Sequence, residues 1–365
     1  MRVLIAGGGT GGHIFPGIAI AEELLRQGVA DEVVFAGTEH GLEAKVVPRE
    51  GFHLHFLKAE GFVGKSPLKK IRALAFFLVS LAQSRSLLQR LRPRLVIGVG
   101  GYASVSMVLA AHMRGIPTLI HEQNAVPGLA NRTLGRFADA IAVTYQESFD
   151  HFAKEKTWLT GNPVRKEMLQ CDERAARAAF HLDPSRFTIF VFGGSSGAHR
   201  INRAVVEALP LLADVRASLQ FIHQTGETDH QYVSDAYAAA GFTGIVVPFV
   251  YRMAEAYALS DIVLCRAGAT TLAEITAIGK PAVLVPYPFA AANHQELNAK
   301  KLEDMGAVRV IHDRNLSGEL VAETFRTLYL DERLRAAMQR SAASFGRADA
   351  ADRIVQVAQS LMRKG

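Results

Sequence analysis

Two short apolar segments, each followed at once by a glycine-rich turn, constrain the fold of this chain most strongly. Residues 3–6 lead into a turn with five glycines that ends at His13, and residues 188–192 lead into the turn at 193–197. A buried strand followed by a glycine loop and a helix is typical of nucleotide-binding α/β folds, because a bare loop lets backbone N–H groups approach a phosphate. The two junctions lie about half the chain apart, which predicts two Rossmann-like domains.

Strand-like and helix-like segments alternate along both halves, and the strand-like segments are nearly continuous apolar runs. This pattern predicts parallel sheets whose two faces are covered by helices. The expected strands are residues 3–6, 32–36, 95–99, 117–121 and 140–143, then 188–192, 218–224, 245–249, 262–265 and 282–285.

The turn residues Gly161, Asn162 and Pro163 follow a short strand and mark the expected domain boundary. The prediction is an N-terminal domain over residues 1–162 and a C-terminal domain over 163–346. Residues 349–362 form an amphipathic pattern, so a helix over about 347–365 is expected to pack back on the N-terminal domain.

Composition excludes several classes of protein. The chain has 365 residues, of which 49% are hydrophobic and 21% charged, so it is not disordered, collagen-like or a coiled coil. The two cysteines, Cys171 and Cys265, form no CxxC pair, which favours a reducing compartment. No segment has the roughly 20 continuous apolar residues of a membrane-spanning helix, so a soluble or peripheral protein is expected.

Positive charge is concentrated in one segment. Residues 61–94 hold eight lysines and arginines and no acidic residue, while the whole chain carries a net charge of +6. Such a segment suits nucleic acid, anionic lipid or phosphorylated substrates, although an ordinary solvated helix face would look the same.

The first glycine loop matches the GxGxxG pattern at Gly7, Gly9 and Gly12. The second expected strand ends without the acidic residue that holds the ribose of a nicotinamide dinucleotide, which disfavours a dehydrogenase. His13 lies at the start of the following helix, where the helix dipole disfavours imidazolium and leaves the ring able to accept a proton. His13 is therefore a candidate general base, with simple packing as the alternative.

Further polar residues follow other strands at the edge where ligands bind in parallel sheets. Ser195 and Ser196 provide hydroxyl donors in the second glycine loop. Glu274 could chelate the two ribose hydroxyls of a nucleotide, or it could form a capping box with Thr271. The remaining candidates are His121, Glu122, Gln123 and Asn124, and then Asn293, His294 and Gln295.

These motifs, in this order and spacing, resemble the MurG family of UDP-N-acetylglucosamine–undecaprenyl-pyrophosphoryl-muramoyl-pentapeptide N-acetylglucosaminyltransferases. The similarity covers nearly the whole chain. It is carried by the segments 8–13, 100–102, 121–125, 161–165, 193–198, 265–269 and 293–295. The resemblance implies a GT-B fold, two Rossmann-like domains that face a central cleft, without cofactor or essential metal. The chain has no Asp-x-Asp motif, which agrees with the last point.

The resemblance also implies how the donor UDP-GlcNAc is bound. The backbone at Val250 would contact uracil and Glu274 the ribose, while Asn124 and Gln295 would contact GlcNAc hydroxyls. The diphosphate and sugar would be held by the remaining residues, which are Thr10, Gly11, Gly12, Arg165, Ser195, Ala269, Thr270, Thr271, Leu272 and Ala273.

The reaction implied is an inverting transfer of GlcNAc to the C4 hydroxyl of muramic acid on an undecaprenyl-linked muramoyl-pentapeptide. We predict that His13 takes the proton of that hydroxyl, with Glu122 as the rival base. Because the acceptor is a lipid, the enzyme must visit the cytoplasmic face of the cell membrane as a peripheral protein. No nucleic-acid partner is expected, and partners among cell-wall or division proteins are left open.

The basic segment then gains a role at anionic headgroups. Lys69, Arg72, Phe76 and Phe77 are the expected membrane contacts. The rest of that helix predicts an inward face of Leu68, Ile71, Leu74, Ala75, Leu78, Leu81 and Ala82.

Two other functions remain open at this point. A UDP-GlcNAc 2-epimerase would share the architecture and the donor, but it needs a second acid–base carboxylate that the sequence does not offer. A noncatalytic nucleotide-sugar-binding subunit would have no use for His13.

Overall fold

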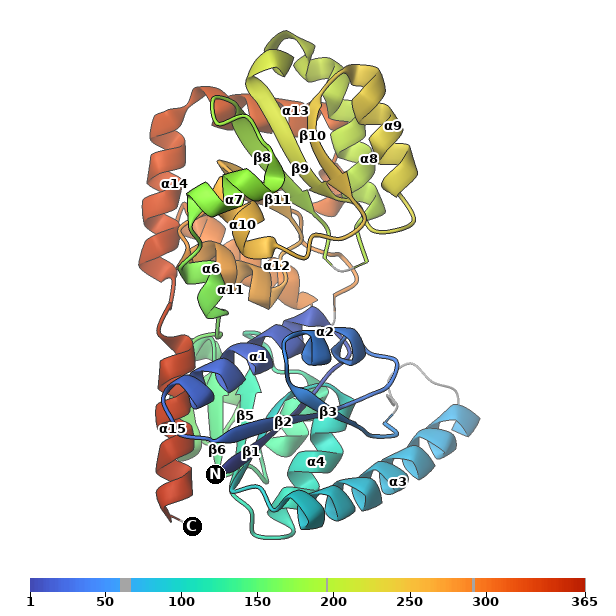
Figure 1. The fold of residues 1–365 in the computed structure, drawn as a ribbon, viewed down its shortest axis with the longest axis vertical. Helices are drawn as coiled ribbons and strands as arrows, with labels where there is room; N and C mark the ends of the chain where they lie inside the picture. The colour runs from blue at the N-terminus through green and yellow to red at the C-terminus, as the bar shows by residue number, and fades with distance from the viewer. Residues whose placement is uncertain (60–66, 195, 291–292, 365) are drawn as a thin grey trace. The chain divides into compact units, whose positions relative to one another are not determined.

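The computed structural model describes residues 1–59, 67–194, 196–290 and 293–364. The chain divides into two compact units (Figure 1). Unit 1 comprises Met1–Arg165 and Arg347–Gly365, and unit 2 comprises Lys166–Gly346. The division follows Arg165, whereas the sequence analysis placed it after residue 162.

Unit 1 is built on a parallel sheet with the strand order β3-β2-β1-β4-β5-β6-β7. Its strands are β1 (Arg2–Gly7), β2 (Glu32–Gly37), β3 (His53–Phe56), β4 (Leu95–Gly100), β5 (Thr118–Glu122), β6 (Ala140–Val143) and β7 (Thr157–Leu159). Its α-helices are α1 (Gly11–Arg26), α2 (Glu43–Arg49), α3 (Pro67–Leu91), α4 (Tyr102–His112), α5 (Leu129–Leu134) and α15 (Ala350–Lys364).

Alternating side chains of β1 fill the core on both faces of this sheet. Val3 and Ile5 are fully buried in one cluster with residues of α1 and α15. Leu4 and Ala6 are buried in another cluster with residues of α3 and α4. Burial on both faces explains why the strand reads as a continuous apolar run.

Unit 2 has a second parallel sheet with the order β10-β9-β8-β11-β12-β13. Its strands are β8 (Phe187–Phe192), β9 (Leu219–Gln224), β10 (Thr243–Val247), β11 (Ile262–Cys265), β12 (Ala282–Leu284) and β13 (Val308–Val310). Its α-helices are α6 (Lys166–Leu169), α7 (Glu173–Phe180), α8 (His199–Ala208), α9 (His230–Ala240), α10 (Met253–Leu259), α11 (Ala269–Ala277), α12 (His294–Asp304), α13 (Gly318–Leu330) and α14 (Glu332–Phe345).

The predicted pair of Rossmann-like parallel-sheet domains is confirmed. The expected strands are found, most with ends shifted by a residue or two. The list of expected strands omits β3, β7 and β13, which lie at the edges of their sheets. Edge strands are short and partly exposed, so their sequences lack the continuous apolar run that marks the central strands.

The predicted inward face of α3 is wrong at Ala75, Leu78 and Ala82, although Leu81 is partly buried against the core as expected. Leu78 is 57% exposed and Ala75 and Ala82 are also exposed, whereas Ser80 and Ser84 are fully buried. The hydroxyl of Ser106 on α4 lies 2.7 Å from that of Ser80 and accepts a hydrogen bond from Ser84. Because the buried hydroxyls satisfy one another, the serine face packs inward and leaves apolar residues outside. The side chains of Leu68, Lys69, Ile71, Arg72 and Leu74 lie outside the described residues.

Both sheets reverse their strand order at a point between two central strands. In unit 1 the reversal lies between β1 and β4, and in unit 2 it lies between β8 and β11. Open α/β sheets bind ligands at such points, beyond the carboxyl ends of the strands. Both glycine loops and the segment that begins at Arg266 follow these strands directly, so the topology places them at ligand-binding positions.

Candidate functional site

The first glycine loop connects β1 to α1 at the switch point of unit 1. Thr10 is the N-cap residue of α1, with an extended backbone and no hydrogen bond from its side chain to the helix end. Gly11 and Gly12 form the first turn and His13 follows them. Thr10 is exposed, so the N-terminal end of α1 is accessible to an anion.

The imidazole of His13 folds back over this loop. Its Nδ1 lies 3.1 Å from the carbonyl oxygen of Gly8 and 3.5 Å from the hydroxyl of Thr10. A carbonyl oxygen only accepts, so this contact requires the proton on Nδ1, and in the neutral ring Nε2 is then the nitrogen that can accept a proton. The ring also lies against Gly100, whose φ is +103° and where a Cβ would come within 2.5 Å of His13 Cδ2. Glycine is required there for both reasons.

A second histidine, His121 at the end of β5, is fully buried. Burial lowers its pKa to about 4, so the ring is neutral at physiological pH. Its Nε2 lies 3.2 Å from the Gly161 carbonyl oxygen, and the amide of Gln123 donates to its Nδ1 and to the Val99 carbonyl oxygen. Sequence analysis named this histidine only as part of a polar run. The structure shows that it links Gly161, in the loop after β7, to Gln123, in the loop after β5.

The rival base, Glu122, is committed to its own loop. One carboxylate oxygen accepts from the backbone N–H and side-chain amide of Asn124. The other accepts from the N–H of Gly128 and the amide of Asn131. Burial nevertheless raises the pKa of this carboxyl group. These four contacts indicate that Glu122 holds the loop in shape, which disfavours it as the base.

Glu43, which sequence reasoning missed, is the fully buried carboxylate of this part of unit 1. One oxygen accepts from the N–H of Gly9, at 2.8 Å, and the other from the N–H and hydroxyl of Thr38, at 2.8 and 2.7 Å. A Cβ at Gly8, Gly37 or Gly41 would collide with this side chain. The sequence signal for this site was the pair Gly37 and Gly41, which end and follow β2 and leave room for the Glu43 side chain.

Arg165 belongs to unit 1 in the structure, although the predicted boundary placed it in the C-terminal domain. Its guanidinium lies over the ring of Phe15, 4.5 Å from the centroid, and 3.9 Å from a carboxylate oxygen of Glu50. Phe15 is on α1, so the arginine packs against the helix that carries His13.

In unit 2 the second glycine loop follows β8 and is joined to the next strands by one buried side chain. Gln224, the last residue of β9, donates to the Gly194 carbonyl oxygen and accepts from the backbone N–H of Val250, both at 2.8 Å. The N–H of Val250, the expected uracil contact, therefore has a partner within the protein. Ser195 lies outside the described residues.

Helix α11 begins at Ala269 with Gly268 as its N-cap residue. Thr270 to Ala273 therefore form its first turns, and Thr271 lies inside the helix. This geometry rules out the capping box between Thr271 and Glu274. Glu274 is 6% exposed and accepts a hydrogen bond from the hydroxyl of Tyr257 at 3.1 Å. The capping-box interpretation was wrong because it assumed a polar side chain at the N-cap, whereas the N-cap residue of α11 is Gly268, which has no side chain.

Gln295 lies near the start of α12, and its side-chain oxygen Oε1 accepts a hydrogen bond from the backbone N–H of Tyr287 at 2.9 Å. Asn293, the N-cap residue, has a φ of 52°. Asn124 in unit 1 contacts Glu122 as described above. The structure thus attaches both predicted sugar-binding amides to loops at the carboxyl ends of their sheets.

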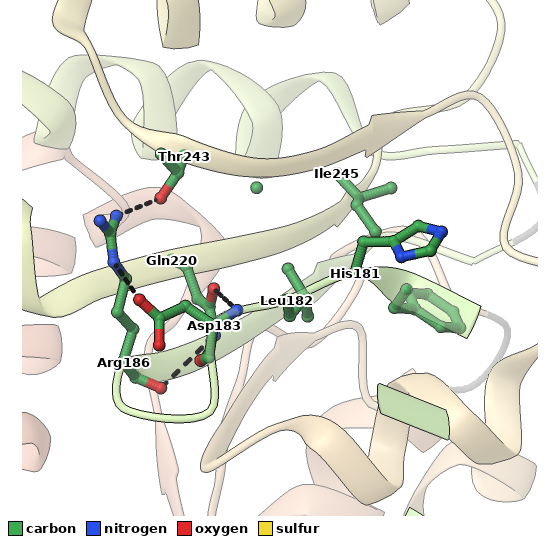
Figure 2. Close-up of a pocket in the computed structure, with 9 residues that line it drawn as sticks. His181, Leu182, Asp183, Arg186, Gln220, Thr243 and Ile245 are labelled. Atoms are coloured by element: carbon green, nitrogen blue, oxygen red, sulfur yellow. Dashed lines mark hydrogen bonds and ion pairs between the residues drawn. The ribbon is translucent and has the colours of Figure 1, made fainter. Parts of the chain in front are cut away.

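A cavity of about 510 Å³ lies at the opposite, amino end of the unit 2 sheet. Figure 2 shows Asp183, Arg186, Gln220 and Thr243 along its wall. Arg186 donates to the Thr243 hydroxyl, and Gln220 donates to the backbone carbonyl of Asp183. These polar groups bind one another, and the cavity is not part of the candidate site.

Over residues 1–59, 67–194, 196–290 and 293–364, no group of three or more His, Cys, Asp and Glu side chains is arranged to hold a metal ion. Within the same ranges no helix is both long and apolar enough to cross a membrane.

A buried polar network supports the second glycine loop and gives a testable pH dependence. The Nε2 of His223 lies 3.1 Å from the side-chain oxygen Oδ1 of Asn202, and the Asn202 side-chain amide donates to the Thr225 carbonyl oxygen and to Asp229. Burial lowers the pKa of His223 from about 6.5 to about 3. His223 therefore takes up a proton near pH 6.5 in the unfolded chain but only near pH 3 in the folded chain. Because the unfolded state binds more protons between these values, the free energy of unfolding falls as the pH drops from 6.5 toward 3.

Urea unfolding at pH 7 and pH 5 measures this effect. We expect acidification to cost the wild type about 2 kcal/mol more than it costs the His223→Gln variant, which keeps a donor for Asn202 but does not titrate. Equal pH dependence in the two proteins would show that His223 is not held neutral by burial.

Family models match both units. The glycosyltransferase family 28 N-terminal domain matches residues 3–143, and the C-terminal domain of the same family matches residues 188–354. Together with the two parallel sheets and their loops, these matches define a GT-B glycosyltransferase.

The relatives identify the family within this class. The chain is 46% identical over 364 residues, and over the full length of both proteins, to the UDP-N-acetylglucosamine–N-acetylmuramyl-(pentapeptide) pyrophosphoryl-undecaprenol N-acetylglucosamine transferase of Thermodesulfovibrio yellowstonii. The crystal structure of MurG from Acinetobacter baumannii superposes with a TM-score of 0.74 at 30% identity, covering 98% of this chain and 99% of that one. The chain belongs to the MurG family of N-acetylglucosaminyltransferases.

A UDP-GlcNAc 2-epimerase from Neisseria meningitidis, solved bound to UDP-GlcNAc, has a TM-score of 0.70 at 14% identity. The match covers 99% of this chain and 100% of that one. At this identity the likeness shows a common fold only.

Proposed function

We propose that the chain transfers GlcNAc from UDP-GlcNAc to the C4 hydroxyl of undecaprenyl-pyrophosphoryl-MurNAc-pentapeptide, with inversion at the anomeric carbon. Membership of the MurG family carries this proposal. The contact of His13 Nδ1 with the Gly8 carbonyl oxygen supports His13 as the base, because a neutral ring protonated at Nδ1 can accept a proton at Nε2.

Unit 2 binds the donor in this proposal. Glu274 reaches the ribose hydroxyls, and the first turns of α11, over residues 269–273, supply backbone N–H groups to the diphosphate. Val250 contacts uracil through its backbone, Gln295 contacts GlcNAc, and Ser195 contacts the diphosphate. The buried position of Glu274 supports its role, since a desolvated carboxylate forms strong hydrogen bonds to two hydroxyls.

Unit 1 supplies the base and further contacts to the donor. His13 accepts the proton as the acceptor oxygen attacks the anomeric carbon, while the C1–oxygen bond to UDP breaks. Thr10, Gly11 and Gly12 place N–H groups of the α1 end near the negative charge that grows on UDP. Asn124 contacts a GlcNAc hydroxyl. Arg165 contributes positive charge beside the same helix.

A transfer assay tests the proposal directly. The purified chain is incubated with UDP-GlcNAc and a synthetic lipid-linked muramoyl peptide, with and without chelator. We expect UDP and a disaccharide lipid in both cases. Free UDP-ManNAc would indicate an epimerase instead, and binding of UDP-GlcNAc without any product would indicate a noncatalytic subunit.

We also propose that α3 contacts the anionic cytoplasmic face of the membrane, because the acceptor is a lipid. Leu78 and Val79 are 57% and 44% exposed, next to the half-buried Phe76 and Phe77. Exposed apolar side chains on a helix rich in lysine and arginine match the chemistry of an anionic bilayer surface. Lys69 and Arg72 remain proposed contacts from the sequence.

Vesicle sedimentation tests this contact. We expect the Leu78→Gln/Val79→Gln variant to bind vesicles with 30% anionic lipid about tenfold more weakly than the wild type. The variant lacks two apolar side chains that would be partly buried in the bilayer when the protein binds. Leu330→Gln, at a 69% exposed position on α13, is the matched control and should bind normally. Wild-type binding that is independent of salt and anionic lipid would contradict the proposal.

A further inference from the structure

Glu43 and His13 lie on opposite sides of one peptide group. The carboxylate of Glu43 accepts from the N–H of Gly9 at 2.8 Å, and the Nδ1 of His13 lies 3.1 Å from the carbonyl oxygen of Gly8. The Gly8 carbonyl and the Gly9 N–H belong to the same amide. A carboxylate, a peptide group and an imidazole therefore form one continuous chain of hydrogen bonds.

We propose that Glu43 is a positioning residue that acts on His13 through the Gly8–Gly9 peptide group. This inference rests on the proposed role of His13 as the base. In serine hydrolases a buried carboxylate bonds directly to Nδ1–H of the catalytic histidine, fixes its tautomer and stabilises the imidazolium. Here the peptide group stands between the two, and the carboxylate acts by polarising it.

The physical basis is cooperative hydrogen bonding. A carboxylate that accepts from an amide N–H draws electron density toward the carbonyl oxygen of the same amide and makes that oxygen a better acceptor. The Gly8 oxygen then holds Nδ1–H more strongly and favours the tautomer that leaves Nε2 unprotonated. It also stabilises the imidazolium that forms when Nε2 takes the proton of the acceptor hydroxyl.

The packing around Glu43 supports a dedicated role. The side chain is fully buried, and its second oxygen is held by the N–H and hydroxyl of Thr38. Any side chain at Gly8 or Gly41 would displace the carboxylate. One carboxylate oxygen is therefore held by Thr38, which follows β2, and the other oxygen accepts from the Gly9 N–H.

Steady-state kinetics of Glu43→Gln test the proposal. The variant loses the charge and places an amide against N–H donors, so we expect kcat to fall about 10- to 100-fold with little change in the KM for UDP-GlcNAc. Thr38→Val is the matched control, because it removes one hydrogen bond to the same carboxylate and leaves the Gly9 contact in place. It should lower thermal stability and should lower kcat far less than Glu43→Gln does.

A double-mutant cycle separates positioning from a general structural effect. If Glu43 acts through His13, adding Glu43→Gln to His13→Ala should change kcat by less than twofold. A further 10-fold loss in the His13→Ala background would overturn the proposal. If His13→Ala itself keeps wild-type kcat, the proposed base is wrong, which is a separate failure.

Nitrogen-15 NMR of histidine-labelled wild-type protein tests the inference with Glu43 itself left unchanged. The spectrum is compared with that of His13→Ala to assign the His13 signals. We expect the neutral ring to be protonated at Nδ1, the less common tautomer of a free histidine. A ring protonated at Nε2 would exclude the hydrogen bond to the Gly8 carbonyl and overturn the proposal.

Discussion

Replacement of His13 by alanine should lower kcat about 10²- to 10⁴-fold, the range that a general base contributes. Binding of UDP-GlcNAc should stay near wild type, because His13 sits on α1 of unit 1 whereas the proposed ribose and diphosphate contacts lie mainly in unit 2. Single-turnover assays of disaccharide formation measure the chemical step, and calorimetric titration with UDP-GlcNAc measures binding.

Two other variants make this result specific. His53→Ala changes an exposed histidine at the start of the edge strand β3 and should leave both measurements unchanged. Glu122→Gln should instead lower the thermal stability of the protein, because it puts an amide among the N–H donors of Asn124, Gly128 and Asn131. If His13→Ala abolished donor binding and left the chemical step intact, His13 would be a binding residue and another group would be the base.

The candidate site was predictable where the chemistry follows the chain locally. The glycine loop after β1 and the helix that begins at Ala269 can be located from a few neighbouring residues, because strand, loop and helix follow one another directly. Parallel strands also place all their carboxyl ends at one edge, so the polar residues after them could be assigned to that edge without coordinates.

The groups that hold these loops in shape were not predictable in the same way. Glu43 binds an N–H that lies 34 residues away in the chain, and Gln224 binds a carbonyl 30 residues away. Such partners are brought together only by strand order, which a single sequence does not specify. The prediction of the inward face of α3 was wrong for a related reason. Ser80 and Ser84 are buried because their hydroxyls pair with Ser106 of α4, which is distant in the sequence.

Replacement of Glu274 by alanine should raise the KM for UDP-GlcNAc about 10²- to 10⁴-fold with a much smaller effect on kcat at saturation. A buried carboxylate that accepts from two ribose hydroxyls loses two charge-assisted hydrogen bonds on truncation, each with a net contribution of about 1.5–3 kcal/mol. Contacts to the ribose are the same in the ground state and the transition state, so their loss appears in KM. Initial rates over a wide range of donor concentrations measure both constants.

The hydroxyl of Tyr257 provides the matched control, since it donates a hydrogen bond to Glu274. Tyr257→Phe keeps the ring, which packs edge-on against Phe190 and Phe192, and removes that hydrogen bond. If Glu274 serves the ribose, Tyr257→Phe should change the donor KM a few-fold at most, through small shifts of the carboxylate. If Glu274 only anchors Tyr257 inside unit 2, both variants should lose similar thermal stability and neither should change donor saturation, which would remove Glu274 from the nucleotide site.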